Sequence, residues 1–506
     1  MAFVRLRNRQ SRMRELRFVL SGVVFILTCF AERPSCHAQV RMSQTQVDTL
    51  LLDLHHALLT YHPFAYERGA RAKLDSVLAL TRTDLRKRFA AQDSLEYSDI
   101  LLQVLPFSDA MQDGHFQLTP KYSRAQREHL KRFGYDLQLV PVQDGQMVLP
   151  DTLEGVREAY PPGTEVIAID GYAIDSLAGR LSLLVGLDDH GNRSAQRLAF
   201  ARYPLAYYQR EVGPRDSVEV TLRMTHPLRP GTIDVWEVLY PDSTVASPGR
   251  RGRRRRARQR MEQLIRLDTT THPDIARLVI RTFSRSAFNR ADEYAHLRRL
   301  FKSVADRKVQ ALVIDVRGNT GGSLGLVNHV LAYLLEDRAQ SIEHSVAYHK
   351  RALGKGPVAR WRYRMAGQVR QVDSSYYATR MAREVKPKRR AAFRGPVAVL
   401  VNEMSFSGAT TLANVIQSSG RGIVVGQTAG GSAERMYAGK TFKVPVGPGD
   451  RLQLNMPLYF MKMPGEQLGN LQPDYIVERR IEDVVAGEDA TLKTAVEQLS
   501  LRLSDD

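Results

Sequence analysis

Two buried-strand sequences, each followed by a polar loop and then by helical spacing, constrain this fold most. The first strand and loop are "ALVIDVRGNTGG" (311–322), and a helical stretch follows to Leu335. The second are "VAVLVNEMSFSGA" (397–409), after which apolar residues recur at i, i+3, i+4 and i+7 as far as Ile416. Another strand, "GIVVGQ" (422–427), comes next. Strands that alternate with helices predict an α/β core.

The rest of the 506-residue chain divides by its hydrophobic pattern, and this length suits two or three domains. Helical spacing dominates 44–112, short alternating strands follow, and a polar, Pro- and Arg-rich region interrupts them before the α/β core. The expected organisation is a signal peptide (1–38), a helical N-terminal domain (44–120), a β-rich module (121–225), a basic linker or insert (226–272), the core (273–490) and a C-terminal helix or tail (491–506).

The N-terminus has the order of a secretory signal peptide. Six arginines precede residue 18, the apolar run "FVLSGVVFILTCF" (18–30) follows, and "SCHA" places small residues at 36 and 38. The apolar run is short for a bilayer span. We therefore expect export to the periplasm or cell envelope with cleavage after Ala38. An uncleaved anchor and lipidation at Cys29 or Cys36 remain alternatives.

Cleavage there would leave no cysteine, because both cysteines lie within the segment. Disulfides, thiolate metal sites and a cysteine nucleophile would then be excluded. We expect no cofactor and no metal.

Much of the formal net charge of +19 is concentrated in one segment. Residues 250–260, "RRGRRRRARQR", hold eight arginines and show no apolar periodicity. Such a block is typical of a solvated insert. Its functional alternative is electrostatic contact between Arg250–Arg260 and an anionic envelope surface or polymer. No zinc spacing, helix-turn-helix or aromatic-laced basic sheet accompanies it, so nucleic acid is not expected as a partner.

Ser407 lies where the second strand gives way to its helix. A hydroxyl at that place would face free N–H groups and the positive end of the helix dipole. The loop at 318–322 holds three glycines, and glycine lets backbone N–H groups face a ligand. Gly408, with Gly321 or Gly322, would then form an oxyanion hole. The alternative for Ser407 is a simple helix N-cap.

The order "LVIDVRGNTGG … VAVLVNEMSFSGA … GIVVGQTAGG … LQPDYIV" resembles the C-terminal-processing (tail-specific) serine peptidases, a family that includes the tricorn core. The resemblance extends over roughly 44–480 and implies a crotonase/ClpP-like ββα superhelix core with Ser407 as nucleophile. The segment "PPGTEVIAIDGYAI" (161–174) resembles a PDZ-like module, as in many exported bacterial members, although its usual carboxylate-binding loop is not visible.

The chain departs from the family's lysine-dependent form. The stretch that would carry the lysine base is "GQTAGGSAERM", with Ser432 at the lysine's place, and Thr410 replaces the acidic residue expected shortly after the nucleophile. A Ser–Lys dyad is therefore not expected.

The tricorn-like branch supplies a Ser-His-Glu alternative. The resemblance implies that His115, in "MQDGHFQL", is the base and that Glu466, in "KMPGEQLGNLQPDY", holds its tautomer. Gly114 stands where that branch has a serine. His115 as a structural histidine and Glu466 as a loop carboxylate remain alternatives, with Glu434 as the nearest rival acid.

The expected function is that of an exported serine peptidase acting on peptides or unfolded protein. A catalytically inactive peptide-binding or scaffold protein on the same fold is the alternative. Acyl chemistry on a thioester is a weaker option, because no feature of the chain indicates coenzyme A binding.

Overall fold

A computed structural model describes the chain between residues 41 and 504. The residues outside the description are 1–40, 91, 96, 121–136, 144, 155–158, 182–187, 189–192, 213–216, 226–231, 240–260, 271, 289–291, 348–368, 372–376, 380–382, 389–390, 451 and 505–506. The expected signal peptide and the basic segment 250–260 thus lie outside it. By their contacts, Arg41–Asp506 form one compact unit.

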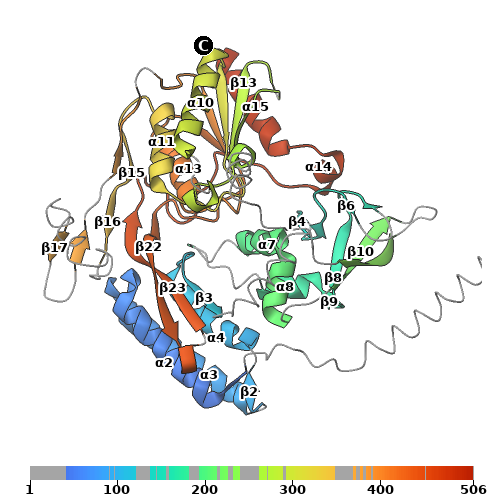
Figure 1. The fold of residues 1–506 in the computed structure, drawn as a ribbon, viewed down its shortest axis with the longest axis vertical. Coiled ribbons are helices and arrows are strands. Elements are labelled where there is room, and N and C mark those ends of the chain that lie inside the picture. The colour runs from blue at the N-terminus through green and yellow to red at the C-terminus, as the bar shows by residue number, and fades with distance from the viewer. Residues whose placement is uncertain are drawn as a thin grey trace, which may run out of the picture. The chain divides into compact units, whose positions relative to one another are not determined.

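The core is a sheet of six described strands in the order β12-β13-β14-β20-β21-β24 (Figure 1). Only β12 runs antiparallel to its neighbour. The strands are β12 (Ile265–Asp268), β13 (Ile275–Ile280), β14 (Ala311–Asp315), β20 (Val397–Val401), β21 (Ile423–Gly426) and β24 (Tyr475–Ile476). The α/β core expected from the alternating strands and helices is present.

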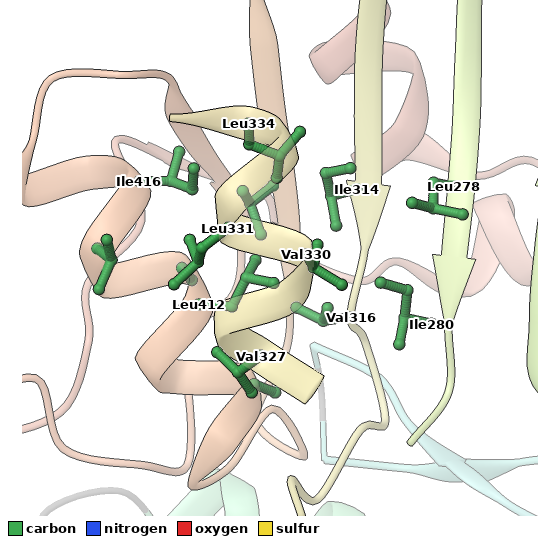
Figure 2. Packing of buried hydrophobic residues seen from close by; sticks show 14 of the residues in the cluster. Leu278, Ile280, Ile314, Val316, Val327, Val330, Leu331, Leu334, Leu412 and Ile416 are labelled. Carbon is green, nitrogen blue, oxygen red and sulfur yellow. The ribbon is translucent and has the colours of Figure 1, made fainter. Parts of the chain in front are cut away.

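Helices cover both faces of this sheet because both faces are apolar. Along β14, Leu312 and Ile314 join the cluster that contains α10 (Glu293–Asp306), α11 (Leu324–Leu334) and α13 (Gly408–Ser418). The alternate residue Val313 joins the opposite cluster, with α15 (Ala490–Ser504). Figure 2 shows α11 and α13 packed against the strands through their leucine, isoleucine and valine side chains. Two covered faces explain why these strands are continuous apolar runs.

A second sheet joins an early part of the chain to a late part. The hairpin of β22 (Arg435–Val446) and β23 (Leu452–Lys462) pairs on one side with β16 (His344–Val346). Strand β23 also pairs with β3 (Gln117–Pro120), in antiparallel register from Leu452↔Pro120 to Asn455↔Gln117. This pairing fixes the position of the residues just before β3, which include His115.

A third sheet has the order β11-β10-β8-β5-β4, with β9 beside β8. The turn at Asp170 and Gly171 joins β8 to β9 with positive φ at both residues (46° and 78°), and an Asp-Gly pair favours such a hairpin turn. The elements are β4 (Val140–Pro141), β5 (Met147–Val148), β8 (Glu165–Ile169), β9 (Tyr172–Ala173), β10 (Val218–Thr225), β11 (Thr232–Leu239), α6 (Ile174–Leu181), α7 (Arg193–Arg202) and α8 (Pro204–Val212).

Three long helices occupy the N-terminal part of the described chain: α2 (Gln44–Tyr61), α3 (Ala70–Phe89) and α4 (Tyr97–Met111). Ser43 caps α2 through a reciprocal pair of hydrogen bonds with Gln46. The remaining elements are β1 (Met42–Ser43), β2 (Ser94–Leu95), β6 (Leu153–Glu154), β7 (Ala159–Tyr160), β15 (Ala339–Ile342), β17 (Val369–Gln371), β18 (Tyr377–Thr379), β19 (Arg383–Val385), α14 (Ile481–Ala486), and the 3₁₀ helices η1 (Pro63–Tyr66), η3 (Arg285–Phe288) and η5 (Pro448–Asp450).

Two features of this arrangement were not expected. The range 226–272, expected to be a linker or insert, contributes β11 to the third sheet and β12 to the core sheet. Residues 117–120, placed at the end of a helical domain, pair with the late hairpin instead. Among the described residues, no helix has the length and apolarity needed to cross a membrane.

Candidate active site

Ser407 lies in the sharp turn between β20 and α13, with an uncommon backbone conformation. Its φ is 52° and its ψ is −115°, whereas an N-cap residue normally has extended, negative-φ geometry. Its side chain makes no capping hydrogen bond. The simple N-cap alternative therefore lacks the interaction that defines it. A strand–turn–helix serine with positive φ is the arrangement that exposes a nucleophilic hydroxyl.

The glycine loop after β14 packs directly on this turn. The amide of Phe406 donates to the carbonyl of Asn319 at 3.0 Å. At Gly321, whose φ is 94°, an added Cβ would lie 2.7 Å from the Gly408 nitrogen and 2.8 Å from the Ser407 Cβ. Only glycine allows this approach.

The two glycine candidates for the oxyanion hole differ in their hydrogen bonds. The N–H of Gly321 donates to Asn319 Oδ1 at 2.8 Å, so it is not free for a ligand. The N–H groups of Gly322 and Gly408 donate to no residue that the structure describes. They also lie close together, because an added Cβ at Gly408 would be 3.4 Å from the Gly322 nitrogen. The geometry thus favours Gly408 with Gly322.

His115 lies beside the turn at Ser407. The segment between α4 and β3 carries it, and its imidazole packs against the ring of Phe406, the residue before Ser407, with 5.0 Å between centroids. The side chain is 20% exposed. Its Nδ1 is buried without a hydrogen-bond partner and lies 3.7 Å from Asp113 Oδ1. The structure therefore brings His115 and the Ser407 turn together.

Asp113 holds the loop that carries His115 through hydrogen bonds to His115 and His62. Its Oδ1 accepts the backbone N–H of His115 at 2.8 Å, and its Oδ2 lies 3.0 Å from His62 Nε2. The side chains of Asp113 and His62 are fully buried. Burial raises the pKa of Asp113, but His115 and His62 outweigh it and hold that pKa below its ordinary value.

Asp188 is a second buried carboxylate at the histidine, and sequence analysis missed it. Its Oδ1 accepts the Gly114 N–H at 3.1 Å, and its Oδ2 accepts the Ser432 N–H at 3.4 Å. One carboxylate oxygen each of Asp113 and Asp188 and one ring nitrogen of His115 lie within 4.8 Å of one another. We assign no metal to this group.

The charges of this group shift its protonation equilibria. Burial and the neighbouring Asp113 raise the pKa of Asp188 to about 6. Burial alone lowers the pKa of His115, but the carboxylates of Asp113 and Asp188 outweigh it, so the pKa lies above its ordinary value. The imidazolium form of His115 is therefore stabilised.

Ser432, at the place expected for a lysine, is a structural residue. Its hydroxyl donates to the Gly469 carbonyl at 3.0 Å and accepts the N–H of Glu434 at 3.1 Å. The hydroxyl of Thr410 donates to the carbonyl of Ser405 at 3.1 Å. Both side chains are therefore committed to local backbone groups.

Among the described residues, the structure gives no contact between Glu466 and His115. Glu466 is exposed. The preceding Pro464 accepts a hydrogen bond from Asn414 at 2.7 Å, in the second half of α13. With a rise of 1.5 Å per residue, that contact lies about 10 Å along the helix from Ser407. In the described chain, the acidic groups clustered with His115 are Asp113 and Asp188.

The chain is similar to known proteins both in sequence family and in fold. Residues 274–460 match peptidase family S41. The fold is similar to mature CPAF in complex with lactacystin, with TM-score 0.61, 14% identity and coverage of 92% of this chain and 99% of that one. Mature CPAF alone gives TM-score 0.58, 14% identity and coverage of 90% and 96%.

The photosystem II D1 C-terminal processing protease gives TM-score 0.42 and 14% identity, covering 88% of this chain and 98% of that one. No curated protein matches the chain. The family that residues 274–460 match is the one expected from the motifs, and this match supports a serine peptidase.

Proposed function

We propose that the chain hydrolyses peptide bonds with Ser407 as nucleophile and His115 as general base, as in the tricorn-like branch. The observation that carries the proposal is the turn at Ser407, with its positive φ and uncapped hydroxyl. The packing of His115 on Phe406 supports the choice of base. A serine hydroxyl needs such a neighbour, because it is a weak nucleophile at neutral pH.

The reaction would proceed in two steps, acylation of Ser407 and hydrolysis of the acyl-enzyme. Ser407 Oγ attacks the scissile carbonyl carbon while its proton passes to His115, and the N–H groups of Gly408 and Gly322 stabilise the oxyanion. The C–N bond then breaks as His115 returns the proton to the departing amine. Water, deprotonated by His115, attacks the acyl-enzyme and releases the second product with Ser407 restored.

Labelling with a fluorophosphonate probe, together with hydrolysis of an unfolded protein, tests this proposal. We expect Ser407→Ala to abolish labelling and hydrolysis, and His115→Ala to reduce kcat by several orders of magnitude. The matched controls are Ser418→Ala, at the exposed end of the same helix, and His56→Ala, on the exposed face of α2. Both should retain wild-type activity. Hydrolysis by Ser407→Ala would refute the nucleophile, and an unlabelled wild-type protein would favour the inactive scaffold.

We also propose export with cleavage after Ala38, and contact of Arg250–Arg260 with an anionic envelope surface. Both rest on sequence alone. The crotonase/ClpP-like ββα description of the core, the helical N-terminal domain and the PDZ-like module likewise remain proposals. For the module, the Asp-Gly hairpin between β8 and β9 is the supporting feature. Peptide or unfolded protein is the proposed substrate class.

A further inference from the structure

We propose that Asp188 is the positioning residue for His115, the acid that orients the imidazole and stabilises its charged form during catalysis. This role rests on the proposed function, because it presumes that His115 is the base. Asp188 belongs to the chain between α6 and α7, in the part that forms the third sheet and its helices. Asp113 lies nearer, with its Oδ1 3.7 Å from His115 Nδ1, but it also pairs with His62, and Glu466 is exposed.

The first requirement is a buried carboxylate near an unsatisfied imidazole nitrogen. His115 Nδ1 is buried and has no hydrogen-bond partner. Asp188 is 8% exposed, and one of its oxygens lies within 4.8 Å of a ring nitrogen of His115. Catalytic hydrogen bonds are often long before substrate binds and shorten in the complex, directly or through one water. The separation is therefore compatible with an orienting contact.

The second requirement is that the acid not be shared with another imidazole. Each oxygen of Asp113 and of Asp188 has one partner and retains a second lone pair. Asp113 is shared, because its Oδ2 pairs with His62. Asp188 accepts the backbone N–H groups of Gly114 and Ser432, at 3.1 and 3.4 Å, and neither donor is a titratable side chain.

Gly114 explains how Asp188 comes so close. An added Cβ at this position would lie 2.3 Å from Phe406 Cζ and 3.2 Å from Asp188 Oδ1. Any side chain would push apart the three groups that meet here. The glycine before the histidine therefore lets the carboxylate and the Phe406 ring close on the base loop from two directions.

The charge balance supports the same role. When His115 takes the proton of Ser407, a positive charge forms in a buried site, which is costly unless an anion is near. The charged or titratable groups around His115 and Asp188 are Asp113 on the base loop and, beyond it, His62 before η1 and Tyr437 on β22. Asp113 is shared with His62, so Asp188 supplies a second anion for the imidazolium.

The test compares Asp188→Asn with wild type across pH. Asparagine preserves shape and removes the charge. We expect kcat to fall by about 10²- to 10⁴-fold with little change in KM. The acidic limb of kcat/KM should move to lower pH, because an anion that favours the imidazolium is lost. Asp175→Asn on α6, whose carboxylate is 72% exposed and pairs with Arg197, is the matched control and should leave both quantities unchanged.

A second measurement does not depend on activity. In the Ser407→Ala background, NMR titration of the His115 ring should give a lower pKa when Asp188→Asn is added. An unchanged His115 titration with wild-type kcat in Asp188→Asn would overturn the inference and leave the Ser407–His115 proposal intact. Loss of kcat in Glu466→Gln with none in Asp188→Asn would also overturn it. A failure of the proposed function would be recognised by a different result, namely that the Ser407→Ala variant still hydrolyses the substrate.

Discussion

Ser407 holds a backbone conformation that costs free energy in a residue with a side chain. Residues held in such sparsely populated regions cost on the order of 1–3 kcal/mol each and persist where the surrounding fold requires them. Here the surroundings are the bond from Phe406 to Asn319 and the close approach of Gly321. An ordinary N-cap residue adopts an unstrained extended conformation. The strained backbone at Ser407 is therefore consistent with a hydroxyl that is positioned to react.

The pH dependence of the wild-type enzyme is a prediction at the residue scale. A base must be neutral, and the pKa of His115 is raised above its ordinary value of about 6.5. Activity should therefore fall as pH drops through a value above 6.5.

A kcat/KM profile between pH 4.5 and 9 checks this prediction. The His56→Ala variant, altered at an exposed histidine, should show the same acidic limb as wild type. A limb centred at or below pH 6 would contradict the arrangement of two carboxylates at one imidazole.

Sequence patterns located some residues of the site and not others, for physical reasons. Ser407 and the glycine loop lie between a buried strand and a helix, where the change in hydrophobic period is visible in the sequence. Asp188 lies on no periodic segment, and it meets Gly114 and Ser432 only through contacts that span 74 and 244 residues. Glu466 was expected from a motif alone, and its loop packs against the far half of α13.

At the scale of elements, the site depends on two strand–loop–helix units that touch through backbone. The loop between β14 and α11 and the turn between β20 and α13 leave no space for a side chain at Gly321. The parallel neighbours β14 and β20 fix this approach, because their carboxyl ends lie side by side. These elements follow from hydrophobic period alone, whereas which glycine N–H remains free depends on the side chain of Asn319.

Substitution of Gly321 by alanine tests that contact. The added Cβ must displace the Gly408 nitrogen, which is a proposed oxyanion donor. We expect kcat to fall by about 10²- to 10³-fold, the usual cost of losing one such donor. The control is Gly420→Ala, whose φ of 67° imposes a similar backbone penalty but whose Cβ would meet nothing within 4 Å.

Thermal unfolding and steady-state kinetics on both glycine variants separate the two effects. Gly420→Ala should lose about 1–2 kcal/mol of unfolding free energy and keep its kcat. Equal kcat in Gly321→Ala and wild type would show that the loop does not set the oxyanion geometry.

For the whole molecule, the proposed active site draws on parts of the chain that sequence analysis assigned to three different domains. His115 follows the N-terminal helices, Asp188 belongs to the part that forms the third sheet, and Ser407 begins a helix of the core. Contacts join all of them within one compact unit, Arg41–Asp506. The expected boundaries describe changes in composition, while tertiary pairing such as β3 with β23 crosses them.

Export is a prediction about the whole molecule. Protein recovered from the cell envelope should begin near Gln39, and N-terminal sequencing checks this. A start at Met1 would contradict cleavage.

If Arg250–Arg260 contact an anionic surface, high salt should release the protein, because screening weakens exposed charges. Replacement of the eight arginines by glutamine should release the protein without added salt while leaving peptide hydrolysis unchanged.

The pairing of β3 with β23 has a consequence for biosynthesis. His115 precedes Gln117–Pro120, and these residues gain their partner only after Leu452–Asn455 have been made. A chain still emerging from the ribosome therefore holds Ser407 without an anchored His115. The order of synthesis would therefore delay assembly of the proposed active site until Leu452–Asn455 have been made.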